Sequence, residues 1–298
     1  MKRLIAICAV IVFFSSGYTI AGTWTTIDYV GATDTYVAGI EGTKVIGEYK
    51  IGDVLHGFLY NGTTWTTLDY PGAINTCPQG IFGSKIVGRY SEDGAIWRGF
   101  LYDGTDWTTI DIPGAVETLP YGIEGDNIVG HYRVSSGNGH GFLYNDTDWK
   151  NIDAPGAIFT SAYGIDGGNI VGQYYDGTYH GFIYDGTTWT TLNAPGAMRT
   201  EAYNINGGNV VGWYSSYTNG PFHGFLYNGG NWTTIDKPEA VYTEIYGIEG
   251  INMVGFYGDA SGNAHGFIYT VPEPATLLLL GLGVSILSGL RKKRSHIE

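Results

Sequence analysis

Short hydrophobic runs alternate with polar turn residues along most of the chain, and the alternation itself repeats. Each copy contains a stretch similar to Trp-Thr-Thr-Ile-Asp, a Val-Gly-x-Tyr or Ile-Gly-x-Tyr segment and usually a His-Gly-Phe-Leu-Tyr segment. These landmarks stay in phase through six copies, whose tryptophans are Trp24, Trp65, Trp107, Trp149, Trp189 and Trp232. A repeat of about 42 residues is typical of propeller blades.

Each copy holds four short runs with the residue types of β-strands. Between Ala162 and Asn193 these runs are AYGID, NIVGQY, HGFIYDG and TWTTLN. Aromatic and β-branched residues dominate the runs, while Asp-Gly, Asn-Gly and Pro-Gly supply the turns. No window of comparable length has helical spacing. The pattern therefore predicts an all-β domain of four-stranded blades.

The ends of the repeat array predict how the domain closes. The array begins with the Trp strand, residues 23–28, and ends with the His-Gly-Phe strand, residues 265–269, which are consecutive strands of one unit. In a propeller, the N-terminal strand would complete the last blade and leave no open edge. A linear β-stack is the alternative, but it would need capping units with polar outer faces, and neither terminal copy is atypical. We predict a six-bladed β-propeller closed by the N-terminal strand.

The N-terminus has the layout of a secretory signal peptide. Lys2 and Arg3 precede an apolar run over residues 4–14, and cleavage after Ala21 suits the small residues there. The apolar run is too short to span a bilayer comfortably. We expect residues 1–21 to be a signal peptide that is removed on export.

Residues 271–298 differ from everything before them. A Pro-Glu-Pro motif comes first, then an apolar stretch over residues 275–290, then a basic cluster. The motif and the cluster are Pro272, Glu273, Pro274, Arg291, Lys292, Lys293 and Arg294. This order resembles the PEP-CTERM sorting signal of Gram-negative bacteria.

The resemblance implies a C-terminal transmembrane sorting helix whose basic end stays in the cytoplasm. The exported chain would be held transiently in the inner membrane, and an exosortase, a membrane transpeptidase, would then cut near the Pro-Glu-Pro. A permanent single-span anchor is the alternative. Residues 22–270 remain as the propeller domain.

The repeat also resembles the extracellular family called HAF, and kelch-type and WD-type blades in general. The resemblance covers all six copies, although this chain has His-Gly-Phe where the family name implies His-Ala-Phe. It implies the propeller architecture and no particular activity, because propellers host many unrelated functions.

Charge and cysteine content exclude two further possibilities. Residues 22–271 carry nine basic and 26 acidic side chains, a net charge near −17. Such a surface repels phosphate backbones, so we expect no nucleic-acid partner. Cys77 is the one cysteine left after export, so no intrachain disulfide is expected.

The recurrent polar residues are interpreted as parts of the scaffold. One repeat position holds His56, Arg98, His140, His180, His223 and His265, and another holds Asp28, Asp69, Asp111, Asp153, Asn193 and Asp236. We expect the first set to donate hydrogen bonds to neighbouring turns, since arginine cannot bind a metal, and the second to cap the following turn. No catalytic, metal-binding or phosphate-binding motif is recognised, so no cofactor is expected.

The loop between the second and third strands varies most among the copies. In a blade of antiparallel strands, these loops share one face with the loops that follow the Trp strands. The loops carry aromatic residues among Asn, Asp and Ser, namely Trp97, Tyr175, Tyr179, Tyr217 and Phe222. Exposed aromatic rings suit sugar stacking or protein contact, so we predict that a ligand binds here; ordinary loop packing is the alternative.

Together these features predict an exported, non-catalytic surface or matrix protein of a Gram-negative bacterium. The propeller would bind extracellular polysaccharide or a surface protein through one face. One alternative is a propeller lyase or hydrolase acting on extracellular glycans, which the apparent lack of non-repeating carboxylate or histidine clusters disfavours. Another alternative is a structural scaffold without a ligand.

Overall fold

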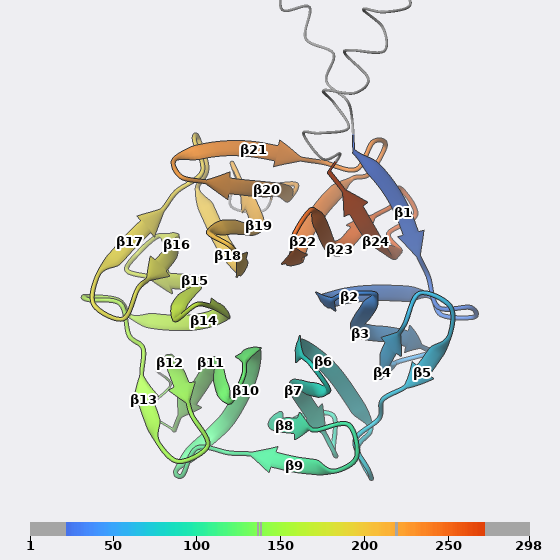
Figure 1. Ribbon diagram of the computed structural model, residues 1–298, viewed down its shortest axis with the longest axis horizontal. Coiled ribbons are helices and arrows are strands. Elements are labelled where there is room, and N and C mark those ends of the chain that lie inside the picture. The colour runs from blue at the N-terminus through green and yellow to red at the C-terminus, as the bar shows by residue number, and fades with distance from the viewer. Residues whose placement is uncertain (1–21, 136, 138, 218–219, 272–298) are drawn as a thin grey trace, which may run out of the picture. The chain divides into compact units, whose positions relative to one another are not determined.

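The computed structural model describes residues 22–135, 137, 139–217 and 220–271. In these ranges the protein is all-β, with no helix, and six groups of four antiparallel strands surround a central axis (Figure 1). This arrangement confirms the predicted six-bladed propeller. The predicted signal peptide (residues 1–21) and sorting helix (residues 275–290) lie outside the described residues. No helix within those residues is long and apolar enough to cross a membrane.

Each blade runs from an inner strand beside the axis to an outer strand at the rim (Figure 1). The inner strands are β2 (Asp34–Glu41), β6 (Asn75–Phe82), β10 (Ala115–Glu124), β14 (Phe159–Asp166), β18 (Arg199–Asn206) and β22 (Tyr242–Glu249). The second strands are β3 (Lys44–Ile51), β7 (Lys85–Ser91), β11 (Asn127–Val134), β15 (Asn169–Tyr175), β19 (Asn209–Ser215) and β23 (Asn252–Gly258).

The outer half of each blade completes the sheet. The third strands are β4 (Val54–Tyr60), β8 (Arg98–Tyr102), β12 (Gly139–Tyr144), β16 (Tyr179–Tyr184), β20 (His223–Asn228) and β24 (Ala264–Thr270). The outer strands are β5 (Trp65–Thr67), β9 (Trp107–Ile110), β13 (Trp149–Asn151), β17 (Trp189–Leu192), β21 (Asn231–Ile235) and β1 (Thr23–Ile27). We number the blades 1 to 6 from the one that begins with β2.

The N-terminal strand closes the ring as predicted. Strand β1 pairs with β24 in antiparallel register, from Thr23 opposite Thr270 to Ile27 opposite Gly266. The ring of Trp24 lies 4.8 Å from Phe267 and 4.5 Å from Tyr269, measured between ring centroids. The last blade therefore has the order β1-β24-β23-β22, and β24 has a hydrogen-bonded strand on each side.

The repeated landmarks build the core between neighbouring blades. The phenylalanines of the His-Gly-Phe segments are almost fully buried in every blade, namely Phe58, Phe100, Phe142, Phe182, Phe225 and Phe267. The glycine of Val-Gly-x-Tyr makes room for this ring: a Cβ on Gly130 would lie 2.5 Å from the Phe142 ring and 2.3 Å from the Leu119 carbonyl oxygen. The packing of the two residues against each other thus explains why this glycine and this phenylalanine are repeated.

Side chains at the end of the inner strands tie each blade to the next. The carboxylates of Glu124 and Asp166 accept hydrogen bonds at 2.8 Å from the backbone N–H groups of Gly167 and Gly207. These contacts lie at the end of the axis where inner strands turn into second strands. The opposite end, where second strands turn into third strands, carries the loops that were predicted to bind a ligand.

Candidate functional site

One position of the repeat varies completely while its neighbours are kept. The variable residue of Val-Gly-x-Tyr lies on each second strand, where it pairs across to the inner strand. From blade 1 to blade 6 the residues are Glu48, Arg89, His131, Gln173, Trp213 and Phe256. An acid, two bases, an amide and two aromatic rings thus replace one another at equivalent places around the axis.

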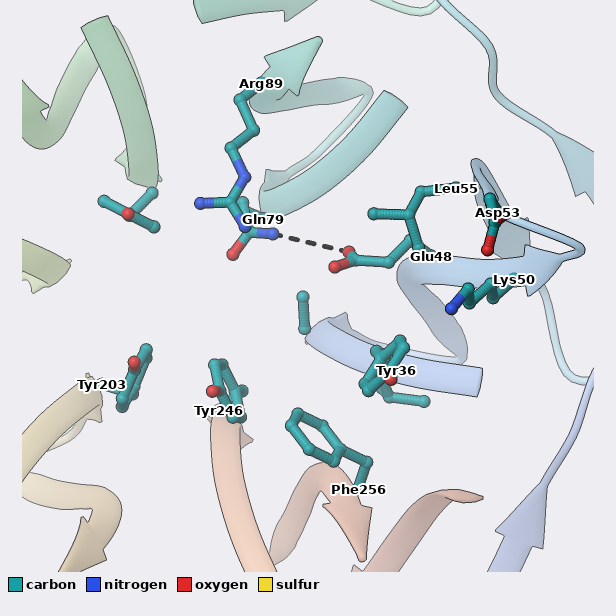
Figure 2. Close-up of a pocket in the computed structure, with 13 residues that line it drawn as sticks. Tyr36, Glu48, Lys50, Asp53, Leu55, Gln79, Arg89, Tyr203, Tyr246 and Phe256 are labelled. Atoms are coloured by element: carbon teal, nitrogen blue, oxygen red, sulfur yellow. Dashed lines mark hydrogen bonds between the residues drawn. The ribbon is translucent and has the colours of Figure 1, made fainter. Parts of the chain in front are cut away.

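A cavity of about 500 Å³ opens at the axis beside several of these side chains. Figure 2 shows Glu48 and Arg89 directed into it from blades 1 and 2, with Tyr203, Tyr246 and Phe256 opposite. Lys50 and Asp53 lie at its edge on blade 1 (Figure 2). We call this cavity the axial pocket. It combines two charges of each sign with aromatic faces.

The floor of the axial pocket is narrowed by tyrosines of the inner strands. The rings of Tyr163 and Tyr203 stack with centroids 4.4 Å apart, and those of Tyr203 and Tyr246 lie 4.1 Å apart. Tyr121 meets Tyr163 edge-on at 4.9 Å. The tyrosines come from four consecutive blades, so they form a continuous apolar floor beneath the charged groups.

Glu48 and Arg89 are the charged pair of the first two blades. The Gln79 amide donates a hydrogen bond to the Glu48 carboxylate at 3.5 Å (Figure 2). Burial raises the pKa of Glu48 to about 7, although Arg89 and the Cys77 thiol act to lower it. The guanidinium of Arg89 lies 5.1 Å from the centre of the Trp97 ring.

A second cluster of charge and aromatic rings joins blades 4 and 5. Arg199 Nε donates a hydrogen bond at 2.6 Å to Glu201, which is only 1% exposed. The same guanidinium lies 4.2 Å from the centre of the Tyr179 ring and 4.9 Å from that of Trp213. Burial raises the pKa of Glu201 to about 7, and contact with Arg199 lowers it only in part.

Glu244 of blade 6 is a third buried carboxyl near the axis, 7% exposed. The Tyr246 hydroxyl donates a hydrogen bond to it at 2.9 Å. Burial raises the pKa of Glu244 to about 7. Glu201 and Glu244 occupy the same repeat position in blades 5 and 6, whereas Glu48 has no acidic counterpart in the other blades. The sequence analysis did not single out these buried acids.

Unpaired polar atoms also concentrate at this variable position. Among the described residues, four buried side-chain atoms have no hydrogen-bond partner: Glu41 Oε2, Arg89 Nε, Gln173 Oε1 and Trp213 Nε1. Three of the four belong to the variable position of Val-Gly-x-Tyr. Of the four residues, Arg89 lines the axial pocket.

The five aromatic residues predicted from the loops lie at the same end of the axis, on three blades. Trp97 packs on Arg89, and Phe222 packs on Trp213 with ring centroids 4.5 Å apart. Tyr175 and Tyr179 lie 4.7 Å apart. Tyr217 is 67% exposed. Four of the five thus contact another aromatic or charged side chain, and they surround the axis without forming one group.

The repeated histidines and acids pair with one another inside each blade. His56 Nδ1 lies 2.8 Å from Asp69, and the matching distances are 2.8 to 2.9 Å in the other blades, including Arg98 with Asp111 and His180 with Asn193. Asp69 also accepts a hydrogen bond from the Gly57 N–H at 3.1 Å. The acids therefore bind across the strands. Our expectation that they cap the following turn is wrong.

A threonine performs the turn-capping role instead. The Tyr70 N–H donates to the Thr76 hydroxyl at 2.9 Å, and the same contact recurs with Thr35, Thr118, Thr160, Thr200 and Thr243. In the part of the chain that the structure describes, no group of three or more His, Cys, Asp or Glu side chains is arranged to hold a metal ion.

The variable position was missed because the sequence analysis compared loops and conserved landmarks, and this residue lies between two landmarks. A signal was available: six unrelated residue types occupy a position flanked by nearly invariant Gly and Tyr. Packing alone does not explain such variation, since the neighbours on the same strand are kept.

Solved structures place the fold among the β-propellers. The SapL1 lectin in complex with α-methyl fucoside is 15% identical, with a TM-score of 0.54 over 82% of this chain and 98% of that one. The β-propeller domain of the Trilobed protease from Pyrococcus furiosus is 10% identical, with a TM-score of 0.50 over 80% and 94%. TolB from Acinetobacter baumannii is 14% identical, with a TM-score of 0.51 over 79% and 63%. At these identities the likeness concerns the fold.

The C-terminal residues indicate how this propeller protein is exported and sorted. Residues 270–294 match the PEP-CTERM protein-sorting motif. The chain therefore combines a β-propeller fold with a PEP-CTERM sorting motif, and the motif implies export, processing by an exosortase and sorting to the cell surface. No curated protein matches the chain in sequence.

Proposed function

We propose that the protein is a non-catalytic, saccharide-binding propeller of the Gram-negative cell surface or extracellular matrix, and that the sugar binds in the axial pocket. The observation that carries the proposal is the lining of this pocket, where the charged side chains of Glu48 and Arg89 face aromatic rings of other blades. Sugars offer hydroxyl groups to charged side chains and apolar ring faces to aromatic side chains, and both kinds of surface occur here.

The loop aromatics extend this site. Trp97 contacts Arg89, which lines the axial pocket, so a loop ring and a group of the pocket can touch the same ligand. Phe222 contacts Trp213, the equivalent residue of blade 5. Tyr217, with most of its side chain exposed, would add a contact on blade 5. The SapL1 lectin supports the proposal only as an example of a sugar-binding protein with a similar fold.

A glycan array probed with the exported protein tests the proposal, and titration calorimetry measures the affinity for the saccharides that bind. Glu48→Gln keeps the shape of the carboxyl and removes its charge, so above pH 7 we expect about tenfold weaker binding. At pH 5, where burial keeps Glu48 protonated, the melting temperature should be unchanged. Glu92→Gln, at an exposed position, is the matched control. An array on which no saccharide binds would contradict the proposal.

A propeller lyase or hydrolase is the second candidate, because Glu48 and Glu244 are carboxyls whose pKa is raised to about 7 by burial. Such groups suit general acid or base catalysis near neutral pH. Incubation with each bound polysaccharide, followed by measurement of new reducing ends or unsaturated sugars, separates the two functions. The non-catalytic proposal expects no product, and product that disappears in Glu48→Gln would favour the enzyme.

Sorting is tested independently of binding. We propose that residues 1–21 and the basic tail from Arg291 are both removed before the protein reaches the surface, and that the inner membrane holds the chain only transiently. Mass spectrometry of the surface form should find neither segment. An intact C-terminus on the outer surface would point to a permanent anchor.

A further inference from the structure

A second cavity lies beside the axial pocket, between blades 2 and 3. This groove of about 480 Å³ is lined on one side by Ile96, Trp97 and Arg98 of the β7–β8 loop and strand β8. The facing side is formed by residues 111–117, which comprise the turn from β9 to β10 and the first residues of β10. The groove therefore combines an indole and aliphatic side chains with Arg98, Asp111 and Glu117.

The groove and the axial pocket share no lining residue, but Trp97 and Arg89 bring their linings into contact. Trp97 lines the groove, and its ring lies 5.1 Å from the guanidinium of Arg89, which lines the axial pocket. One extended ligand could therefore contact both side chains. Indole rings are well suited to stacking on the apolar face of a sugar ring.

Arg98 departs from the repeat at this same place. The other five blades have a histidine here, and each histidine pairs with the acid or amide that follows the outer strand of its own blade. Arg98 keeps that pairing through one nitrogen, 2.8 Å from Asp111, although its side chain is 50% exposed. A guanidinium carries five N–H donors, so donors remain that face the groove.

We propose that the groove is a second sugar subsite, so that a neutral saccharide chain lies across blade 2 from the axial pocket to the groove and stacks on Trp97. This inference rests on the proposed function and specifies its ligand as an oligosaccharide. Neutral sugars are favoured because the groove holds two acids against one base, and residues 22–271 carry a net charge near −17, which repels polyanionic chains.

Binding as a function of chain length tests the inference. The probes are the mono- to hexasaccharides of β-1,4-linked glucose, β-1,4-linked mannose and α-1,6-linked glucose, with oligogalacturonides of the same lengths as charged counterparts. Titration calorimetry on the exported protein should show, in at least one neutral series, an affinity that rises at least about tenfold from the monosaccharide to the longer chains. The charged series should bind more weakly at each length.

Arg98→His is the sharpest variant, because it installs the residue that five other blades already use and so should leave folding unchanged. We expect it to weaken binding of the longer chains about tenfold and to leave monosaccharide binding as it is. His140→Arg, the reverse exchange in blade 3, is the matched control and should change neither. Trp97→Ala should weaken binding of the longer chains about thirty-fold, so that affinity no longer rises with chain length. Trp97→Phe should restore part of that affinity.

The outcomes separate this inference from the proposed function. A monosaccharide that binds as tightly as its oligomers, or an Arg98→His protein with unchanged affinity for every chain, would overturn the second subsite and leave sugar binding in the axial pocket standing. Failure of all these series together with an empty glycan array would remove both. Length dependence confined to oligogalacturonides would overturn the preference for neutral chains.

Discussion

The outer and inner halves of each blade follow different rules. In the outer half, the same pairs recur from blade to blade: a buried phenylalanine against a tryptophan, and a histidine beside an acid. Beside the axis, equivalent positions hold Glu48, Arg89 and Trp213, which have nothing in common. Repetition marks the residues that packing requires, whereas irregularity at an otherwise constant position marks the residues that packing leaves free for function.

Removal of β1 should break the outer scaffold most severely. Deletion of residues 23–28 would leave β24 as an exposed edge strand and remove the contacts of Trp24 with Phe267 and Tyr269. We expect a loss of at least about 3–5 kcal/mol in the free energy of unfolding, the cost of losing one large buried aromatic residue. Chemical denaturation measures it, and an unchanged midpoint would contradict closure by this strand.

Phe142→Ala and Trp97→Ala compare the two halves directly. Phe142 is fully buried, so its truncation should cost about 3–5 kcal/mol and leave the sugar affinity of the folded fraction unchanged. Trp97 is only half-buried, so Trp97→Ala should lower the free energy of unfolding less than Phe142→Ala does and should weaken sugar binding more. Melting curves and calorimetry on both proteins provide the readout. A Trp97 variant that unfolds early and binds normally would place this residue with the scaffold.

The carboxyls beside the axis predict a pH dependence of stability. Burial raises the pKa of Glu244 from about 4.5 in the unfolded chain to about 7 in the folded protein. Folding therefore favours the protonated form, and stability falls as the pH rises from about 5 through 7. We expect Glu244 to account for about 2–3 kcal/mol of this loss.

Unfolding of the wild type and of Glu244→Gln at pH 5 and pH 8 checks the sign. The variant should be the more stable of the two at pH 8, because glutamine carries no charge and can still accept the Tyr246 hydrogen bond. Its pH dependence should be shallower and not absent, since Glu48 and Glu201 remain. If the stability of the variant fell between pH 5 and pH 8 as steeply as that of the wild type, Glu244 would be shown to ionise freely in the folded protein.

The recurrent surface pairs should give the smallest effect. His223→Ala removes the partner of Asp236, whose side chain is 41% exposed, so we expect a loss of no more than about 1 kcal/mol. Denaturation and sugar binding should both stay close to wild type. A loss of binding would mean that the repeated histidines belong to the site.

Much of the fold could be predicted from the sequence, because strands and turns depend on residue types that lie close together in the chain. The glycine of Val-Gly-x-Tyr and the phenylalanine that packs on it recur at fixed spacing, and the phase of the two ends predicted that the N-terminal strand completes the last blade, as β1 does by pairing with β24. The hydrogen bonds of the repeated acids were less predictable. Asp69 lies directly before its turn in sequence, yet Thr76, from the following strand, caps that turn.

The axial pocket could be predicted only in part. The residues that line it lie about one repeat apart in the sequence, and their chemistry emerges only when the ring brings them together around one axis. Burial in the ring raises the pKa of Glu48, and Arg89 and Cys77, which act to lower it, belong to the next blade. The loop aromatics were found because they vary, and the same criterion applied inside the strands would have found the pocket.

Closure by the N-terminal strand also determines how the protein can bear mechanical load. Thr23 and Thr270 pair at one point on the rim, so the chain enters and leaves the propeller side by side. A tension applied through residue 271 would act on β24, which is hydrogen-bonded to β1 on one side and β23 on the other. The pull is thus shared by two ladders and cannot peel away an edge strand, while the axial pocket lies away from the rim that takes the strain.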